Sequence, residues 1–291
     1  MIIDKQEDVT RAVLEEMHRT PDARTREILS ALVKHLHAFV REVKLTEREF
    51  EEAIGTLNAI GQNTTPSHNE AMLMAGALGV SNLICLLNNG LKGTRPTQAN
   101  NLGPFYRAGA PRCENGASIV RSPTPGPALY FRGSVRDLDG RAIAGATAEV
   151  WHPSPVGLYE NQDATQAEMN LRGRFTTDAN GAFSFRSVKP SGYPVPTAGP
   201  TGALLRAQKR HNFRPAHLHF LIHKPGFKTI ASQVYDPSDP HLETDSQFGV
   251  TRALIGNFQK NGDEYSLEFT FILEPGESWL PKAPITQKVA A

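Results

Sequence analysis

The stretch that decides this fold reads Arg214-Pro215-Ala216-His217-Leu218-His219-Phe220. Its apolar residues alternate with histidines, and this is typical of a β-strand, where side chains point to opposite faces with a period of two residues. His217 and His219 therefore share one face of the strand. Two imidazoles side by side on a rigid surface suit a transition metal. The pair alone is equally compatible with two half-buried histidines that bind no ligand.

Further short strands are predicted on both sides of this stretch. Alternating patterns run through residues 130–136, 217–223, 229–235 and 265–273. Asp137-Leu138-Asp139-Gly140 predicts a turn, and Asn180-Gly181 predicts a hairpin. Many short strands with turn signals and no long helix between them favour an antiparallel sandwich or barrel.

The first hundred residues predict helices instead. Apolar residues recur with a 3.6-residue period from Arg24 to Val43. Thr46-x-x-Glu49 and Ser67-x-x-Glu70 have the pattern of capping boxes, and each would open another helix. Proline and glycine become frequent near residue 91. We therefore predict an α+β chain, with a helical domain over residues 1–100 and an antiparallel β-sandwich domain over residues 101–291.

Composition excludes several classes of protein. The 291 residues carry a formal net charge of +1, so no strong attraction to nucleic acid or to an anionic membrane is expected. The sequence contains no run of about 18 apolar residues, so no membrane-spanning helix is expected. The two cysteines, Cys85 and Cys113, argue against a disulfide framework and fit a reducing compartment. A cytoplasmic location is therefore expected.

Two tyrosines stand in unusual places. Tyr159 follows a stretch rich in proline and glycine just beyond a predicted strand, and Tyr193 precedes a proline that favours extended backbone. Each alone would most often be a rim aromatic with its hydroxyl in water. Together with His217 and His219 they make a set of two phenols and two imidazoles. Phenolate is a hard anionic donor that suits a trivalent metal, and a phenol ionises at neutral pH only beside a strong cation.

A set of segments spread over nearly the whole chain carries a family resemblance. They are Leu78-Gly79-Val80-Ser81, Gly103-Pro104-Phe105, Gly133-x-Val135-x-Asp137-x-x-Gly140, Ala148-Glu149-Val150-Trp151, Gly157-Leu158-Tyr159, Gly173-Arg174-Phe175, Tyr193-Pro194-Val195-Pro196 and the stretch 214–220. On these segments the chain resembles the intradiol ring-cleaving dioxygenases, specifically the group of catechol 1,2-dioxygenases and hydroxyquinol 1,2-dioxygenases. The combination is far more specific than the two histidines alone.

The resemblance implies an Fe3+-dependent enzyme that uses O2 to cleave an aromatic diol between its two hydroxyls, giving a muconate-type dicarboxylate. The four ferric ligands of the family match Tyr159, Tyr193, His217 and His219. Two catalytic polar residues match Arg214 and Gln233. The resemblance further implies that Tyr193 leaves the metal when substrate binds, which makes it a candidate base. Arg214 would stabilise developing negative charge; its alternative role is a salt bridge at a strand end.

The substrate is predicted from the pocket walls. The candidate wall residues are Leu73, Gly76, Leu102, Gly103, Pro104, Phe105 and Gln247. The segments 197–202 and 245–250 are similar to the hydroxyquinol group, whereas Gly76 replaces an acidic residue expected there and Gln233 is typical of catechol enzymes. Gln247 puts an amide on a wall that is commonly apolar, and this favours a ring with an extra polar substituent. We predict hydroxyquinol or a substituted catechol, with plain catechol as the alternative.

Two other classes of protein remain open from the residues. A zinc enzyme could use the two histidines, and a non-catalytic transthyretin-like module also opens with the pattern Gly133-x-Val135-x-Asp137-x-x-Gly140. Neither class would need both tyrosines. The resemblance also implies a homodimer through the N-terminal helices, in which a lipid can occupy a tunnel between them. The apolar surface of those helices favours such an interface.

Overall fold

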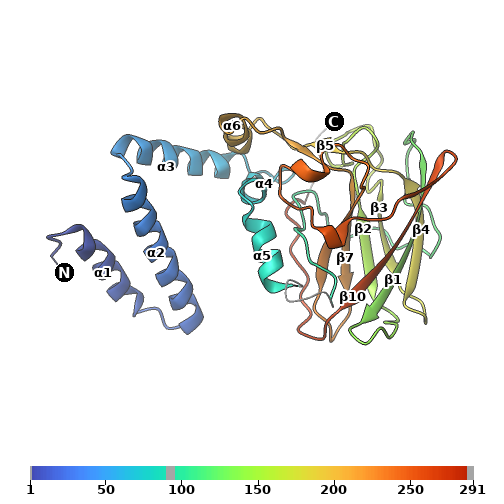
Figure 1. Cartoon of the computed structure of the whole chain (residues 1–291), viewed down its shortest axis with the longest axis horizontal. Helices are drawn as coiled ribbons and strands as arrows, with labels where there is room; N and C mark the ends of the chain where they lie inside the picture. The colour runs from blue at the N-terminus through green and yellow to red at the C-terminus, as the bar shows by residue number, and fades with distance from the viewer. Residues whose placement is uncertain (1, 90–95, 287–291) are drawn as a thin grey trace. The chain divides into compact units, whose positions relative to one another are not determined.

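A computed structural model describes residues 2–89 and 96–286 (Figure 1). The helices before the first strand are α1 (Gln6–Met17), α2 (Ala23–Val43), α3 (Glu47–Gln62), α4 (Glu70–Ala77) and α5 (Val80–Asn88). The strands that follow are β1 (Ala128–Asp137), β2 (Thr147–Trp151), β3 (Arg172–Thr176), β4 (Ala182–Val188), β5 (Tyr193–Pro194), β6 (Phe213–Arg214), β7 (His217–His223), β8 (Ile230–Tyr235), β9 (Gln259–Asn261) and β10 (Glu264–Leu273). Helix α6 (Pro200–Ala207) lies between β5 and β6, and 3-10 turns η1 (Leu242–Thr244) and η2 (Arg252–Leu254) follow β8. The predicted order of helices and then strands is confirmed.

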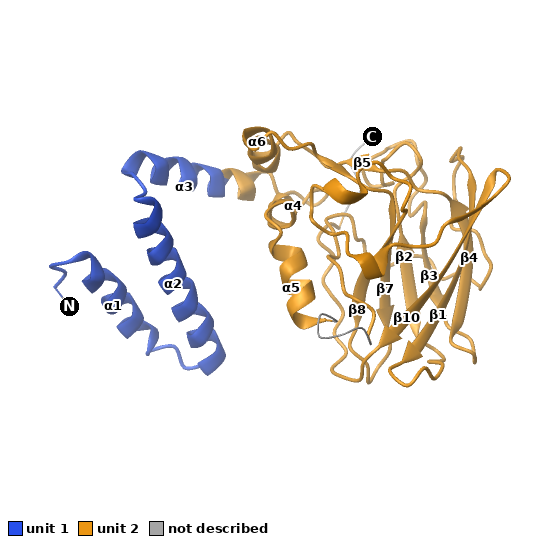
Figure 2. Cartoon of the chain, in the orientation of Figure 1, with its two compact units in different colours: residues 1–58 blue, residues 59–291 orange. Residues whose placement is uncertain are grey.

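The chain forms two compact units, residues 1–58 and residues 59–291 (Figure 2). The division falls within α3, so α4 and α5 belong to the same unit as the strands. The domain boundary predicted at residue 100 stays a prediction.

Two four-stranded sheets make the sandwich. One has the order β4-β1-β10-β9 and the other the order β3-β2-β7-β8, while β5 and β6 form a separate pair. The predicted antiparallel sandwich is confirmed as a class, with one exception: β1 pairs with β10 in parallel, from Leu129 opposite Tyr265 to Asp137 opposite Leu273. Parallel neighbours need a long connection, and here the whole second sheet lies between them in the sequence.

The second sheet is buried on both of its faces. Leu218, Phe220 and Ile222 are fully buried in the cluster between the two sheets, where the rings of Phe220 and Phe131 lie 4.9 Å apart. The intervening side chains of β7 point the other way, and His217 and His219 are equally buried there. The predicted alternation of β7 is confirmed, and it explains why a strand with two histidines contributes to the core.

The helices of the first unit follow the predicted pattern. The apolar run from Arg24 to Val43 forms α2, which begins one residue earlier, at Ala23. The capping box before α3 is formed, because Glu49 accepts a hydrogen bond from the backbone N–H of Thr46 at 2.9 Å, and the Thr46 hydroxyl accepts one from Glu49 N–H at 3.3 Å. Large apolar side chains on these helices are exposed, among them Ile28, Leu32, Leu36, Phe39, Val43, Phe50 and Leu57.

The capping box predicted at Ser67 is wrong. Asn69 caps α4 instead, and its side chain accepts from Met72 N–H at 2.8 Å. Glu70 is buried, and its carboxylate accepts from Thr201 N–H at 2.8 Å, in the first turn of α6. A helix N-terminus offers free N–H donors, so a buried carboxylate is better paired there than at its own backbone.

The apolar run after Ser67 forms two helices where one was predicted. The chain bends by 75° between α4 and α5. None of the described helices is long and apolar enough by itself to cross a membrane, although α4 and α5 taken together reach the required length and composition.

The hairpin predicted at Asn180-Gly181 is also wrong. The turn does not join two paired strands; it carries the chain from β3 in one sheet to β4 in the other. Gly181 is held against β1, because its carbonyl accepts from Val135 N–H at 2.8 Å. This pairing with a third strand overrides the local preference of the Asn-Gly dipeptide.

Replacing Gly181 by alanine is expected to destabilise the sandwich by about 1–3 kcal/mol. Gly181 has a φ of +72°, and a Cβ there would lie 2.5 Å from the carbonyl oxygen of Val135. Urea unfolding measures the loss. Gly226→Ala is the matched control, because Gly226 has a φ of +88° with no atom within 4 Å of the added carbon. Gly226→Ala therefore measures the cost of backbone strain without a steric clash. An equal loss of stability in both variants would contradict a clash between the added methyl group and Val135.

Candidate metal centre and substrate pocket

A cavity of about 250 Å3 opens in the second compact unit beside α4, α5 and the segment that leads from the helices to the sheets. All of the predicted wall residues line it, namely Leu73, Gly76, Leu102, Gly103, Pro104, Phe105 and Gln247. Tyr193 and Arg214 line it as well. An engineered cavity of about 150 Å3 binds benzene, so this space is sufficient for one substituted aromatic ring.

The four predicted metal ligands come together next to this cavity, and each is at most 1% exposed. The Nε2 atoms of His217 and His219 lie 3.0 Å apart. The hydroxyls of Tyr159 and Tyr193 lie 3.3 Å apart, and the rings of Tyr193 and His217 are in contact at 5.5 Å. Residues from β7, from β5 and from the loop after β2 therefore meet at one point.

Neighbouring rings fix the directions of these side chains. Trp151 lies opposite His219 in the sheet and stacks on its ring at 4.8 Å with an angle of 8° between the planes. Phe105 stacks on the ring of Tyr159 at 4.6 Å. Such contacts hold aromatic side chains in single orientations, as a metal centre requires.

The donor atoms fit a hard, positively charged metal. Nδ1 of His217 donates to the carbonyl of Pro215 at 2.6 Å, so Nε2 carries the lone pair. Nδ1 of His219 is buried without a hydrogen-bond partner among the described residues. No group of three or more His, Cys, Asp and Glu side chains is placed to hold a metal in the part of the chain that the structure describes. The two phenols are thus needed to complete a ligand set, which disfavours a zinc site of the usual kind.

Burial controls the protonation of these groups. It raises the pKa of Tyr159 well above the ordinary value, and it also raises the pKa of Tyr193. Burial, together with the nearby Arg214 guanidinium, lowers the pKa of His217 and of His219 well below the ordinary value. Both imidazoles are therefore neutral and ready to bind a metal, whereas the phenols need a cation beside them to ionise.

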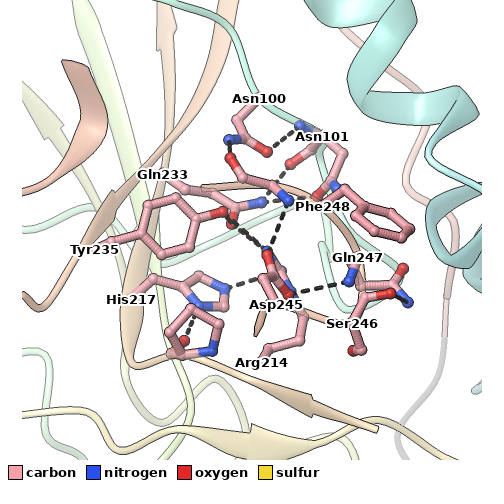
Figure 3. Close-up of polar contacts among 12 residues, drawn as sticks. Asn100, Asn101, Arg214, His217, Gln233, Tyr235, Asp245, Ser246, Gln247 and Phe248 are labelled. Carbon is pink, nitrogen blue, oxygen red and sulfur yellow. Dashed lines mark hydrogen bonds and ion pairs between the residues drawn. The ribbon is translucent and has the colours of Figure 1, made fainter. Parts of the chain in front are cut away.

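Arg214 is the charged group of the cavity. It lies directly opposite Tyr193 in the pair β5–β6, and its side chain is 2% exposed. Its Nη1 lies 3.1 Å from Nε2 of His217, and its Nη2 donates to the Tyr235 hydroxyl at 2.9 Å (Figure 3). Burial disfavours the charged form, but Asp245, Tyr235 and Tyr193 together outweigh it and raise the pKa of Arg214 well above the ordinary value. A permanent positive charge therefore faces the cavity.

Gln233 lies behind Arg214 and does not line the cavity. Its Oε1 accepts from Nη2 of Arg214 at 2.9 Å and from the Tyr235 hydroxyl at 2.5 Å. Its Nε2 donates to the carbonyl and side-chain oxygens of Asn101, at 2.8 and 2.7 Å. The structure thus connects Gln233 to the site through Arg214, which suits a positioning role better than contact with a substrate.

Gln247 and Gly76 form one wall together. A Cβ placed on Gly76 would lie 1.9 Å from Oε1 of Gln247, so the amide occupies the space that a side chain at position 76 would need. The Gln247 Nε2 donates to the carbonyl of Ser246 at a long 3.4 Å, and the side chain is 4% exposed. The amide therefore has hydrogen-bonding groups at the cavity whose only protein contact among the described residues is this long one.

Three site residues were not predicted from the sequence: Asn101, Tyr235 and Asp245. Tyr235 and Gln233 lie two apart on β8, opposite His217 and His219 in the register, so the period of two could have identified Tyr235. Asn101 immediately precedes the predicted wall segment. Asp245 opens a turn without periodicity, and nothing in that pattern points to its contact with Arg214.

Comparisons with known proteins identify the family of the chain. A family model described as "Dioxygenase" matches residues 102–275, and one described as "Catechol dioxygenase N terminus" matches residues 22–94. A 6-chlorohydroxyquinol 1,2-dioxygenase of Cupriavidus pinatubonensis is 39% identical over 93% of this chain and 98% of its own length. A hydroxyquinol 1,2-dioxygenase of a Rhizobium species is 37% identical over 89% of this chain and 87% of its own.

Solved structures agree as well. The crystal structure of hydroxyquinol 1,2-dioxygenase from Pseudomonas putida superposes with a TM-score of 0.83 at 33% identity, covering 93% of this chain and 99% of that one. Likeness on this scale decides against both the zinc enzyme and the non-catalytic module. The chain belongs to the intradiol ring-cleaving dioxygenase family and is an oxidoreductase of that class.

Proposed function

We propose that the protein cleaves a single-ring aromatic diol between its two hydroxyl-bearing carbons and adds both atoms of O2 to give a muconate-type dicarboxylate. The observation that carries this proposal is the meeting of Tyr159, Tyr193, His217 and His219 beside a ring-sized cavity that Arg214 lines. Fe3+ is the cofactor we propose for these four residues, since iron is typical of the family. When bound, Fe3+ would act as a Lewis acid on the diol and would mediate its reaction with O2.

The side chains have separate tasks in this proposal. Tyr193 takes a diol proton at its phenolate oxygen, which is why its place on the cavity wall matters. Tyr159 stays in the ligand set, held by the stacked ring of Phe105. Arg214 stabilises negative charge on the ring, and Gln233 keeps the guanidinium in place. The apolar walls exclude water from the reacting ring.

For the substrate we propose hydroxyquinol, or a catechol with a polar substituent. Gln247 supports this choice, because its amide is almost buried and makes only a long hydrogen bond to Ser246. Hydroxyquinol is also the substrate in the names of several relatives. Plain catechol is the alternative, and Gln233, which is typical of catechol enzymes, is its support.

The purified protein is expected to be red to burgundy and to contain iron, because phenolates bound to Fe3+ absorb visible light. The measurement is a visible spectrum with metal analysis, repeated after anaerobic addition of each diol. Displacement of Tyr193 by the diol would change the band. A colourless, zinc-loaded protein with diol-cleaving activity would contradict the iron centre.

Hydroxyquinol is expected to give a kcat/KM about 5- to 150-fold above that of catechol. This range corresponds to the roughly 1–3 kcal/mol that an unpaired buried amide costs. Oxygen uptake with the two diols under the same conditions measures the ratio. A ratio below one would favour the catechol alternative and leave the reaction class unchanged.

We further propose a cytoplasmic homodimer that associates through its N-terminal helices and can hold a lipid there. Exposed apolar side chains on α2 and α3, including Leu32, Phe39 and Leu57, support an apolar interface. Sedimentation at micromolar concentration tests the dimer, and a monomer would contradict it.

A further inference from the structure

A single carboxylate joins two parts of the site that have different tasks. Asp245 is buried, and each of its oxygens accepts two hydrogen bonds (Figure 3). Oδ1 accepts from Nε of Arg214 and from the backbone N–H of Gln247, both at 3.1 Å. Oδ2 accepts from Nη2 of Arg214 at 3.1 Å and from the backbone N–H of Gly249 at 2.9 Å. The guanidinium and the turn over residues 245–249 are thus held by the same group.

The contact with Arg214 opposes the cost of burying charge. The ion pair has both side chains 2% exposed. Burial raises the pKa of Asp245, but the charge of Arg214 and the hydrogen bonds that the carboxylate accepts together outweigh it, so the net pKa is lowered and the carboxylate stays charged. Two parallel N–H···O contacts fix the plane of a guanidinium as well as its position. The direction in which Arg214 faces the cavity therefore depends on Asp245.

The turn carries the pocket wall. Its middle residue, Gln247, fills the space above Gly76. Side chains from elsewhere anchor the turn's carbonyls: Asn100 donates to Gly249 at 2.5 Å, and Arg210 donates to Ser246 at 2.7 Å. The carboxylate of Asp245 ties this anchored turn to Arg214, so a shift of either would move the other.

We propose that Asp245 is a positioning residue that sets the Arg214 guanidinium and the Gln247 wall at the same time. The inference rests on the proposed function and deepens it. The Asp245 carboxylate then positions both the charge that stabilises the reacting ring and the wall that selects the ring substituent. Rate and substrate preference should consequently change together when Asp245 changes.

Gly249 gives a second way to disturb the same contacts. A Cβ on Gly249 would lie 2.4 Å from the Tyr235 hydroxyl, 2.8 Å from Nη2 of Arg214 and 3.0 Å from Oδ2 of Asp245. The backbone at this residue approaches the network so closely that even a methyl group would have to displace one of these side chains. Gly249→Ala therefore pushes on the junction of Arg214 and Asp245 and removes no charge.

The test is Asp245→Asn, measured as kcat per bound iron. Asparagine has the same shape, but its NH2 group faces N–H donors in either orientation, because both oxygens of Asp245 accept. We expect kcat per iron to fall about 10- to 100-fold, the loss typical of a small misplacement of a catalytic group. The hydroxyquinol-to-catechol ratio of kcat/KM should also shift by at least about threefold. The resting visible band should stay as in the wild type, because the metal ligands are unchanged.

Asp178→Asn is the matched control. Asp178 accepts from the backbone N–H groups two and four residues later, Asn180 and Ala182, as Asp245 does in its own turn. It is exposed and does not line the cavity. This variant should keep the wild-type kcat per iron and the wild-type ratio, which separates turn capping from the positioning of Arg214.

A double-mutant cycle completes the test. In an Arg214→Gln background, Asp245→Asn should change kcat per iron less than about threefold, because the group that it positions is gone. A wild-type kcat per iron in Asp245→Asn, or an equally large fall in the Arg214→Gln background, would overturn the inference. If Asp245→Asn does not fold, Gly249→Ala takes its place in the same cycle with the same two outcomes. A wild-type protein that consumes no O2 with any diol would instead overturn the proposed function.

Discussion

His217→Ala is expected to give a colourless protein that retains little iron and has no measurable dioxygenase activity. His217 is fully buried, and its Nε2 lies 3.0 Å from Nε2 of His219, where we propose that the iron binds. Loss of a group that merely orients a ligand costs about 10- to 100-fold in metal affinity, so loss of a ligand itself should cost more than about 100-fold. Iron content per protein and the visible spectrum measure the effect.

His223→Ala is the control for this loss. His223 lies on the same strand, but its Nδ1 is hydrogen-bonded to the Thr229 hydroxyl at 2.9 Å and it is not one of the four proposed ligands. This variant should keep its iron and its colour. Equal iron content in His217→Ala and His223→Ala would show that the metal is held elsewhere.

Arg214→Gln is expected to lower kcat per bound iron about 100- to 1,000-fold, as removal of a donor to developing negative charge does in other enzymes. The affinity for the diol should change less than kcat, because the charge is needed most during the reaction. The variant leaves Asp245 without its cationic partner, and breaking a buried pair costs about 3–5 kcal/mol of stability. Rates must therefore be expressed per bound iron at a temperature where the variant is folded.

The exposed Arg206 provides the comparison for Arg214. It donates to the carbonyl of Thr197 at 3.0 Å on α6 and does not line the cavity. Arg206→Gln should keep wild-type kcat and KM. A loss of less than about tenfold in Arg214→Gln would contradict the role of its charge in the reaction.

Local patterns predicted the parts of the fold that local forces control. The period of two placed His217 and His219 on one face, because strand side chains alternate wherever the strand lies. The parallel pairing of β1 with β10 could not be predicted in this way. These strands are far apart in the sequence, and their pairing depends on how the whole sandwich closes. The hairpin prediction at Asn180-Gly181 was wrong for a similar reason. The dipeptide carries no sign that Gly181 pairs with Val135 of β1.

The site likewise has residues that the sequence motifs predict and residues whose role depends on the folded chain. All the predicted wall residues line one cavity, and the four predicted ligands meet beside it, because the family's motifs specify them residue by residue. Asp245 was not predicted, although the segment that contains it was singled out. Its importance comes from two backbone donors and one guanidinium that converge on it only in the folded chain. Such convergence leaves no periodic trace in a sequence.

The close fit of Gln247 against Gly76 makes the effects of changes at these two positions depend on each other. Any larger residue at position 76 requires the Gln247 amide to move from its place against α4. While the glutamine remains, a replacement at position 76 therefore changes the pocket twice, through its own side chain and through the displaced amide. Once residue 247 is smaller, the same replacement acts through its own side chain alone, so its effect on ring preference depends on the background in which it arises.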